Sequence, residues 1–191
     1  MSTSSSTTTE AVCTPFLVKV TRRLEEARAL DPVVAAVKPL AGALIASQGR
    51  RSLLQGEWLG HAIHPILTDL PLGFWTSATV LDLVGGAEAR PAARRLVGLG
   101  VLSAAPTAIT GWAEWGSIDG QRERRVGVVH AVSSATAALT YAASWHARHL
   151  GEHARGRNLA LAGAAIAAAG GYLGGHLASA RKVSSRHPAF D

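Results

Sequence analysis

The chain has 191 residues, of which 48% are hydrophobic and 17% are charged, and its formal net charge is +6. This length suits one compact domain or one small group of membrane helices, and the low charge argues against a disordered protein. The single cysteine, Cys13, excludes a disulfide framework and any all-cysteine zinc or iron–sulfur site within the chain.

The chain begins with a polar segment and then becomes amphipathic. Residues 1–13 are rich in Ser and Thr and lack the basic start and apolar core of a signal peptide, so we expect a disordered tail. Residues 14–58 are expected to form an amphipathic, interfacial helical region. Its first helix lies either at the membrane surface or as a cap on the other helices, and its apolar side chains recur at helical spacing: Phe16, Leu17, Val20, Leu24 and Ala27.

A second helix in this region is expected to begin at Asp31 and Pro32, because an N-cap side chain followed by proline is typical of a first helical turn. Lys38 and Pro39 interrupt the apolar character of this helix. The sequence therefore leaves open whether residues 32–48 enter the membrane.

Long stretches without charged residues follow. Residues 96–113, 126–147 and 158–180 contain no Asp, Glu, Lys or Arg. Each stretch is long enough to cross the hydrocarbon core of a bilayer, which is roughly 30 Å thick. An earlier stretch, from Ile66 to Val84, is also apolar but contains two aspartates. We therefore expect four membrane helices.

These four stretches predict the fold class. We expect an all-α protein in which residues 59–180 form a four-helix transmembrane bundle, preceded by the short amphipathic helical N-terminal region. A soluble four-helix bundle is the alternative, but a soluble helix needs a charged outer face and residues 126–147 have none.

Basic residues cluster at the ends of the expected spans, which is typical of a multi-pass membrane protein. They form no single face for nucleic acid, so we expect the lipid bilayer as a partner and no nucleic acid. The side that holds the N-terminal region, the second loop and the C-terminus has the larger number of Lys and Arg. Positive-inside bias then places both termini in the cytoplasm, with residues 181–191 as a cytoplasmic tail.

Four histidines fall at one end of the expected spans. His61 and His64 begin the first span, His130 lies near the start of the third, and His176 lies near the end of the fourth. Since the first and third spans run in one direction and the fourth runs back, all four are expected at one depth near the cytoplasmic face. Ionisable groups are scarce and costly inside spans, and neutral imidazole is the commonest ligand for metals and haem iron. The pattern predicts a metal or haem site, with a hydrogen-bonded polar cluster as the alternative.

Four further residues are candidates for supporting this site. Thr68 lies one turn from His64, and Asp69 follows it as a possible acceptor for the free N–H of a ligating imidazole or as a carboxylate that reaches water. Glu114 is interpreted as a metal ligand, a proton carrier or an interfacial charge. Tyr172 lies one turn before His176 on the same face.

Glycines flank the last of these histidines. Gly170, Gly171, Gly174 and Gly175 form two overlapping pairs of small residues, which let another helix, or a flat macrocycle, approach closely. Helix packing alone is the simpler interpretation. A second histidine cluster at the other end of the third span is interpreted as a solvated basic loop and consists of His146, His149 and His153.

Several of these segments resemble an uncharacterised bacterial membrane-protein family, catalogued as domain of unknown function 2231. The matching motifs lie between residues 60 and 177, at 60–73, 110–115, 125–130 and 170–177. The resemblance implies four spans, the same histidines and a multi-pass location in the bacterial inner (plasma) membrane. Members of the family are sometimes joined to Rieske iron–sulfur or cytochrome c domains, which points toward electron transfer. No Rieske motif is found here, so we expect such a partner to be a separate protein.

Three function classes follow from these patterns. The leading hypothesis is an electron-transfer subunit with one b-type haem, whose axial ligands are His130 and His176, with His61 or His64 replacing either. A quinone or a separate Rieske or cytochrome protein would exchange electrons with it. The runner-up is a non-haem site in which the four histidines bind zinc, iron or copper and Glu114 or Asp69 assists. The third is a cofactor-free structural or proton-relay subunit. No motif of a conventional soluble hydrolase or dehydrogenase is present in the sequence.

Overall fold

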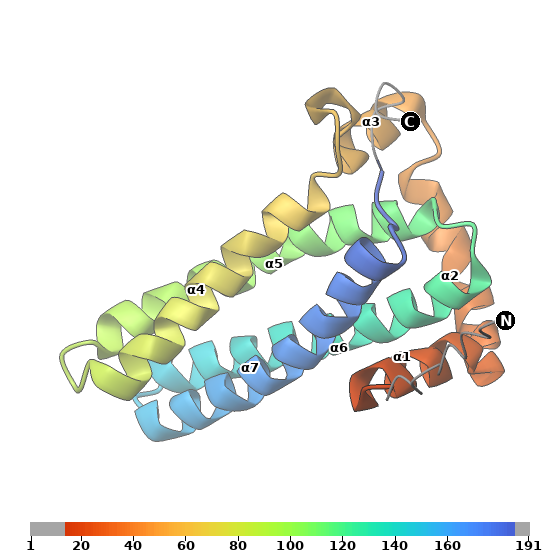
Figure 1. The fold of residues 1–191 in the computed structure, drawn as a ribbon. Helices are drawn as coiled ribbons and strands as arrows, with labels where there is room; N and C mark the ends of the chain where they lie inside the picture. Colours follow the sequence, from red (N-terminus) through yellow and green to blue (C-terminus); the bar gives the residue numbers. More distant parts are fainter. Residues whose placement is uncertain (1–13, 186–191) are drawn as a thin grey trace, which may run out of the picture.

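The computed structural model describes residues 14–185, so the expected disordered tail over residues 1–13 lies outside the described part, as do the last six residues of the expected cytoplasmic tail. The regular elements in the described part are helices (Figure 1), which confirms the all-α prediction. The seven α-helices are α1 (Phe16–Glu26), α2 (Asp31–Leu44), α3 (Gln48–Gln55), α4 (His64–Val84), α5 (Arg90–Gly116), α6 (Gln121–His149) and α7 (His153–Gly175). A π-helical turn, His176–Ala180, continues α7.

The four long helices are arranged as two antiparallel hairpins. α4 and α5 form the first hairpin, and α6 and α7 form the second. Helix α5 packs on α6 and α4 packs on α7, so that α4 and α6 lie diagonally opposite each other. Figure 1 shows the hairpins side by side at their connecting turns and farther apart toward the opposite end, where α4 and α6 begin.

Three of these helices are long and apolar enough to cross a membrane: α5, α6, and α7 with its π-helical extension. Helix α4 has the length to cross but is less apolar, because it contains Asp69, Asp82 and several Thr, Ser and Pro residues. The bent pair formed by residues 28–44 and 48–55, with an angle of 103° between its two parts, is a fourth candidate. The membrane character of the chain is therefore supported, and a bundle of four spans stays a prediction.

The N-terminal region packs across one end of the hairpins. Helix α1 packs on α6, α2 packs on α5 and α6, and α3 packs on α5. The second helix begins where the sequence predicts, with Pro32 in its first turn. These helices are thus packed on the hairpins, as the capping interpretation of residues 14–58 expects.

The face of helix α1 that packs on the hairpins is centred on polar side chains. Its buried side chains are polar, Thr21 and Glu25, whereas Phe16 is 75% exposed and Leu17 is 49% exposed. Of the expected apolar face, Leu24 packs against the small core cluster around Val126. The polar face turns inward because Glu25 finds cationic partners there.

Candidate functional site

His64, the first residue of α4, points toward α5. Its Nδ1 lies 3.0 Å from the backbone carbonyl oxygen of Thr107. Because a carbonyl oxygen can only accept, Nδ1 carries the proton and the neutral ring keeps a lone pair on Nε2. The ring packs against Gly111, where an added Cβ would come within 2.8 Å of the His64 Cε1 atom. Gly111 therefore leaves the space that this imidazole occupies.

His130, in α6, has the same environment in the second hairpin. Its Nδ1 donates to the carbonyl oxygen of Gly170 at 2.7 Å. Its ring packs against Gly174, where an added Cβ would come within 2.9 Å of the His130 Cε1 atom. In residues 14–185, Nε2 of His130 and Nε2 of His64 have no hydrogen-bond partner.

The two hairpins are equivalent beyond these two histidines. Residues at the same spacing recur in α4 and α6, the helices that begin the two hairpins: His64, Trp75 and Asp82 in α4, and His130, Tyr141 and Arg148 in α6. The residues that contact the histidine and aromatic rings also recur at one spacing in α5 and α7, the second helices of the two hairpins. They are Gly100, Thr107 and Gly111 in α5, and Gly163, Gly170 and Gly174 in α7. The hairpins are therefore related by an approximate two-fold axis, and His64 and His130 occupy equivalent positions about it.

Two contacts between α4 and α6 lie on this axis. The rings of Trp75 and Tyr141 are stacked, with centroids 4.1 Å apart and an interplanar angle of 5°. Arg148 Nη1 donates to Asp82 Oδ1 at 2.8 Å, and the second pair of atoms of these side chains is also bonded. Both side chains of this ion pair are buried. These contacts fix α4 against α6, and His64 and His130 precede them by the same number of residues in the two helices.

His176 has a different partner. Its Nε2 donates to Glu25 Oε1 at 2.8 Å, and Arg181 also bonds both carboxylate oxygens of Glu25. Burial raises the pKa of the Glu25 carboxyl, but the hydrogen bonds and charges of Arg181 and His176 outweigh burial and hold the pKa below its ordinary value. His176 therefore ties the end of α7 to α1.

The other predicted residues lie apart from the two-histidine arrangement. His61 is exposed, precedes α4 and bonds only the carbonyl oxygen of its neighbour, Ala62. The Thr68 hydroxyl donates to the Pro65 carbonyl in its own helix. Asp69 is exposed, and Tyr172 packs beside the core cluster around Val126 and Leu173. The roles that the sequence suggested for these residues therefore stay predictions.

Glu114 anchors the segment that follows the last helix. Its two carboxylate oxygens accept from the backbone N–H and the hydroxyl of Ser185, at 2.9 and 2.5 Å. The Ser185 hydroxyl also lies 3.0 Å from the Gln55 carbonyl oxygen, and its own carbonyl accepts from the N–H of Ala62. Glu114 thus joins the C-terminal segment to the helix ends beside His64.

In residues 14–185 no three His, Cys, Asp or Glu side chains lie in an arrangement that could hold a metal ion. Of the predicted set of four histidines, His64 and His130 have equivalent environments, each bonded to a backbone carbonyl of its own hairpin. The structure gives the other two histidines, His61 and His176, different partners. This geometry does not test the prediction of a haem or metal site. It identifies His64 and His130 as the two histidines whose substitution would test it.

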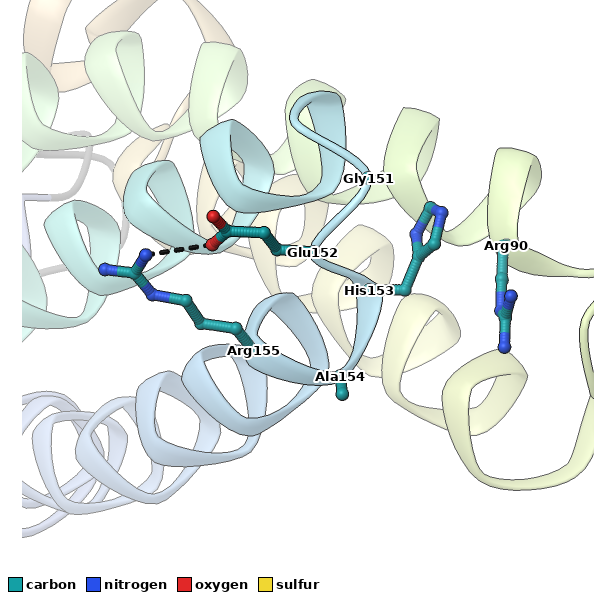
Figure 2. Close-up of a pocket in the computed structure, with 6 residues that line it drawn as sticks. All are labelled: Arg90, Gly151, Glu152, His153, Ala154 and Arg155. Carbon is teal, nitrogen blue, oxygen red and sulfur yellow. Dashed lines mark hydrogen bonds and ion pairs between the residues drawn. The ribbon is translucent and has the colours of Figure 1, made fainter.

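The second histidine cluster lies at the other end of the hairpins. His146 and His149 are exposed, and the His149 ring bonds the Trp145 carbonyl of its own helix. Figure 2 shows His153, at the start of α7, facing Arg90 at the start of α5 across a shallow, open hollow. Arg155 on the rim of this hollow pairs with Glu152. His146 and His149 therefore fit the solvated basic loop that the sequence predicts, whereas His153 is partly buried and its Nδ1 has no hydrogen-bond partner in the described residues.

The fold and the two equivalent imidazoles define a class, a helical membrane protein with three candidate spans and one histidine in the same environment in each of two equivalent hairpins. Comparison with known families then identifies the group. The chain belongs to the family described as predicted membrane protein (DUF2231), which matches residues 60–187 and so confirms the family suggested by the sequence motifs. No curated protein and no solved structure matches the chain.

Sequence reasoning missed two parts of this arrangement. It did not find the partner of His176, since Glu25 lies far away in the sequence, on a helix expected either at the membrane surface or as a cap on the other helices. It also did not find the repeat. The detectable signal was the matched spacing of histidine and aromatic residue in α4 and α6, together with the matched glycines in α5 and α7.

Proposed function

We propose that this protein is a membrane electron-transfer subunit that holds one b-type haem between His64 and His130. The observation that carries the proposal is the equivalent anchoring of the two imidazoles. Each ring is oriented by an Nδ1–H bond to a helix carbonyl and each leaves its Nε2 lone pair uncommitted. Such a backbone hydrogen bond is the usual support of an imidazole that ligates a metal, because it fixes the tautomer and the ring orientation.

The residues around the pair suit the group. Gly111 and Gly174 let the two rings approach α5 and α7 closely, and no side chain at these positions competes for that space. Diagonally opposite helices of a bundle are where cofactor sites are built from facing side chains. A haem bound by two histidines supplies one-electron transfer, with a potential set by its ligands and their hydrogen bonds.

The proposed ligand pair differs from the pair that the sequence favoured. His176 was expected as an axial ligand, but its Nε2 is engaged by Glu25 in a buried cluster that also includes Arg181. Binding iron would require this hydrogen bond to break and would leave Glu25 paired with Arg181 alone. His64 needs no such rearrangement, because its Nε2 has no partner in the described part of the chain.

The membrane setting completes the proposal. The four long helices cross the bacterial inner membrane, with the histidine end and both termini at the cytoplasmic side. A site at one depth cannot carry electrons across the membrane alone. A quinone or a separate Rieske or cytochrome protein therefore exchanges electrons with it at the histidine end. Cysteine-accessibility labelling at each end of the hairpins tests this orientation.

The test of the haem is a reduced-minus-oxidised absorption spectrum of detergent-purified protein from haem-supplemented cells. We expect a b-type band in the parent protein, loss of the band in His64→Ala and His130→Ala, and retention in the matched variants His61→Ala and His176→Ala. Far-UV circular dichroism shows that the variants keep their helices. A parent protein without any haem band, or a band lost with His176 rather than His64, contradicts the proposal.

A two-coordinate copper ion is the second candidate. It is favoured because His64 and His130 both leave Nε2 uncommitted, whereas residues 14–185 contain no group of three potential ligands such as a zinc site needs. Elemental analysis that finds one copper per chain and no porphyrin selects this candidate. A colourless and metal-free protein selects the cofactor-free structural subunit.

A further inference from the structure

Helix α1 presents an unusual surface for a helix outside the candidate spans. The side chains it buries are Thr21 and Glu25, while Phe16, Leu17 and Val18 in its first turn are 75%, 49% and 39% exposed. A solvent-facing helix ordinarily turns apolar side chains inward and polar ones outward. The first turn of α1 departs from this pattern and exposes an apolar surface that requires an apolar neighbour.

Basic side chains follow this apolar turn. Lys19, Arg22 and Arg23 are all exposed, one to two turns along the same helix. In residues 14–185 none of the three forms an ion pair. An exposed apolar turn followed by basic side chains without ion pairs is complementary to an anionic lipid surface, in which acyl chains lie beneath phosphate groups.

The packing of α1 gives this surface a direction. The C-terminal half of the helix is held at the histidine end, where Glu25 bonds His176 and Arg181, and where Arg125 donates to the Glu25 backbone carbonyl at 2.7 Å. Phe16 lies nine residues earlier, about 13 Å away along a helix that rises about 1.5 Å per residue. Figure 1 shows α1 beside the first half of α6, with its N-terminal end toward the middle of the hairpins. The apolar turn therefore points toward the membrane-crossing part of the protein.

We propose that α1 is a binding element for anionic lipid headgroups, with Phe16, Leu17 and Val18 seated at the boundary of the acyl chains. Lys19, Arg22 and Arg23 bind the phosphates above them, their long side chains reaching the headgroup level. The buried ion pairs of Glu25 hold the helix against the hairpins so that this surface stays oriented. The proposal does not depend on the haem.

The test uses the full chain in nanodiscs. Cys13→Ser removes the single cysteine, and Phe16→Cys then carries an environment-sensitive fluorophore. Glu26→Cys, at the other end of α1, is the matched control. We expect strong quenching of the Phe16→Cys probe by nitroxide lipids labelled near the headgroup, and little quenching of the Glu26→Cys probe. Equal quenching of the two probes by aqueous iodide overturns the proposal.

Charge is tested separately by adding phosphatidylglycerol to phosphatidylcholine nanodiscs and following the Phe16→Cys probe. We expect the apparent affinity for phosphatidylglycerol to fall at least about fivefold when Arg22→Gln and Arg23→Gln are combined, since each basic residue near an anionic surface contributes about this factor. The matched pair Arg50→Gln and Arg51→Gln, exposed on α3, should leave it unchanged. A response to phosphatidylglycerol that is the same in both double variants, or absent in the parent, overturns the proposal.

Discussion

Gly174→Ala tests whether the His130 imidazole is fixed in the position that the proposed site requires. The new Cβ would lie 2.9 Å from His130 Cε1 and 3.3 Å from Nδ1. Real Cβ atoms do not approach other atoms so closely, so the ring must move. Moving it breaks or weakens the bond from Nδ1 to the Gly170 carbonyl, which is 2.7 Å long.

The magnitude follows from two opposing effects. Alanine in a helix interior is favoured over glycine by about 1 kcal/mol, whereas overpacking a filled site costs about 1–3 kcal/mol. Gly171→Ala is the matched control on the same helix, because a Cβ there meets nothing within 4 Å. Gly171→Ala should therefore stabilise the protein by up to about 1 kcal/mol, and Gly174→Ala should be less stable than this control by about 1–3 kcal/mol.

The assay is thermal unfolding of the two variants and the parent in the same detergent. For a chain of this size 1 kcal/mol corresponds to a change in Tm of about 2–4 °C, so Gly174→Ala should melt at least about 2 °C below Gly171→Ala. The absorption spectrum of haem-supplemented protein is a second readout, since a displaced His130 should also weaken the proposed haem band. Equal melting temperatures, or a more stable Gly174→Ala, would refute the close packing of His130 on α7.

Three further predictions follow from the contacts around the site. Asp82→Asn leaves the buried Arg148 without its carboxylate and should lower the free energy of unfolding by about 3–5 kcal/mol, while an apolar replacement of both residues should recover most of the loss in the same melting assay. Glu25, whose pKa is lowered in the folded protein, should hold α1 in place above its ordinary pKa and lose this contribution only as the pH falls through the lowered value; hydrogen exchange of α1 against pH should show this loss, and Glu25→Gln should abolish the pH dependence. Gly100→Ala and Gly163→Ala should both destabilise the protein in thermal melts, Gly100→Ala more strongly, because the new Cβ atoms would lie 2.2 Å from the Trp75 ring and 3.0 Å from the Tyr141 ring.

The sequence predicts the main features of the fold because hydropathy and length act locally. Three charge-free stretches became the three helices that can cross a membrane. The start of α2 at Asp31 and Pro32 also follows from local chemistry, since proline fits the first turn of a helix. Placing histidines at one end needed only the direction of each span, and the structure does place His64 and His130 at equivalent positions there.

The partners of the histidines could not be predicted in the same way. Whether His176 meets a ligand or Glu25 depends on how α1 docks, and the apolar periodicity of α1 indicates a different face from the one that packs. Burial of Glu25 becomes favourable only once His176 and Arg181 are both present, which is a property of three segments far apart in the sequence. Local patterns do not contain this information.

The approximate two-fold axis bears on the proposed role of the two equivalent histidines. A residue on the axis faces its own equivalent, so like charges there would repel each other and two copies of one bulky side chain would compete for one space. The equivalent residues Asp82 and Arg148 are indeed opposite in charge and bond directly. His64 and His130 are equivalent yet identical, and neither Nε2 bonds the other ring. Identical electron-pair donors in equivalent positions suit a shared electron-pair acceptor between them, which is what a metal ion with two axial imidazoles provides.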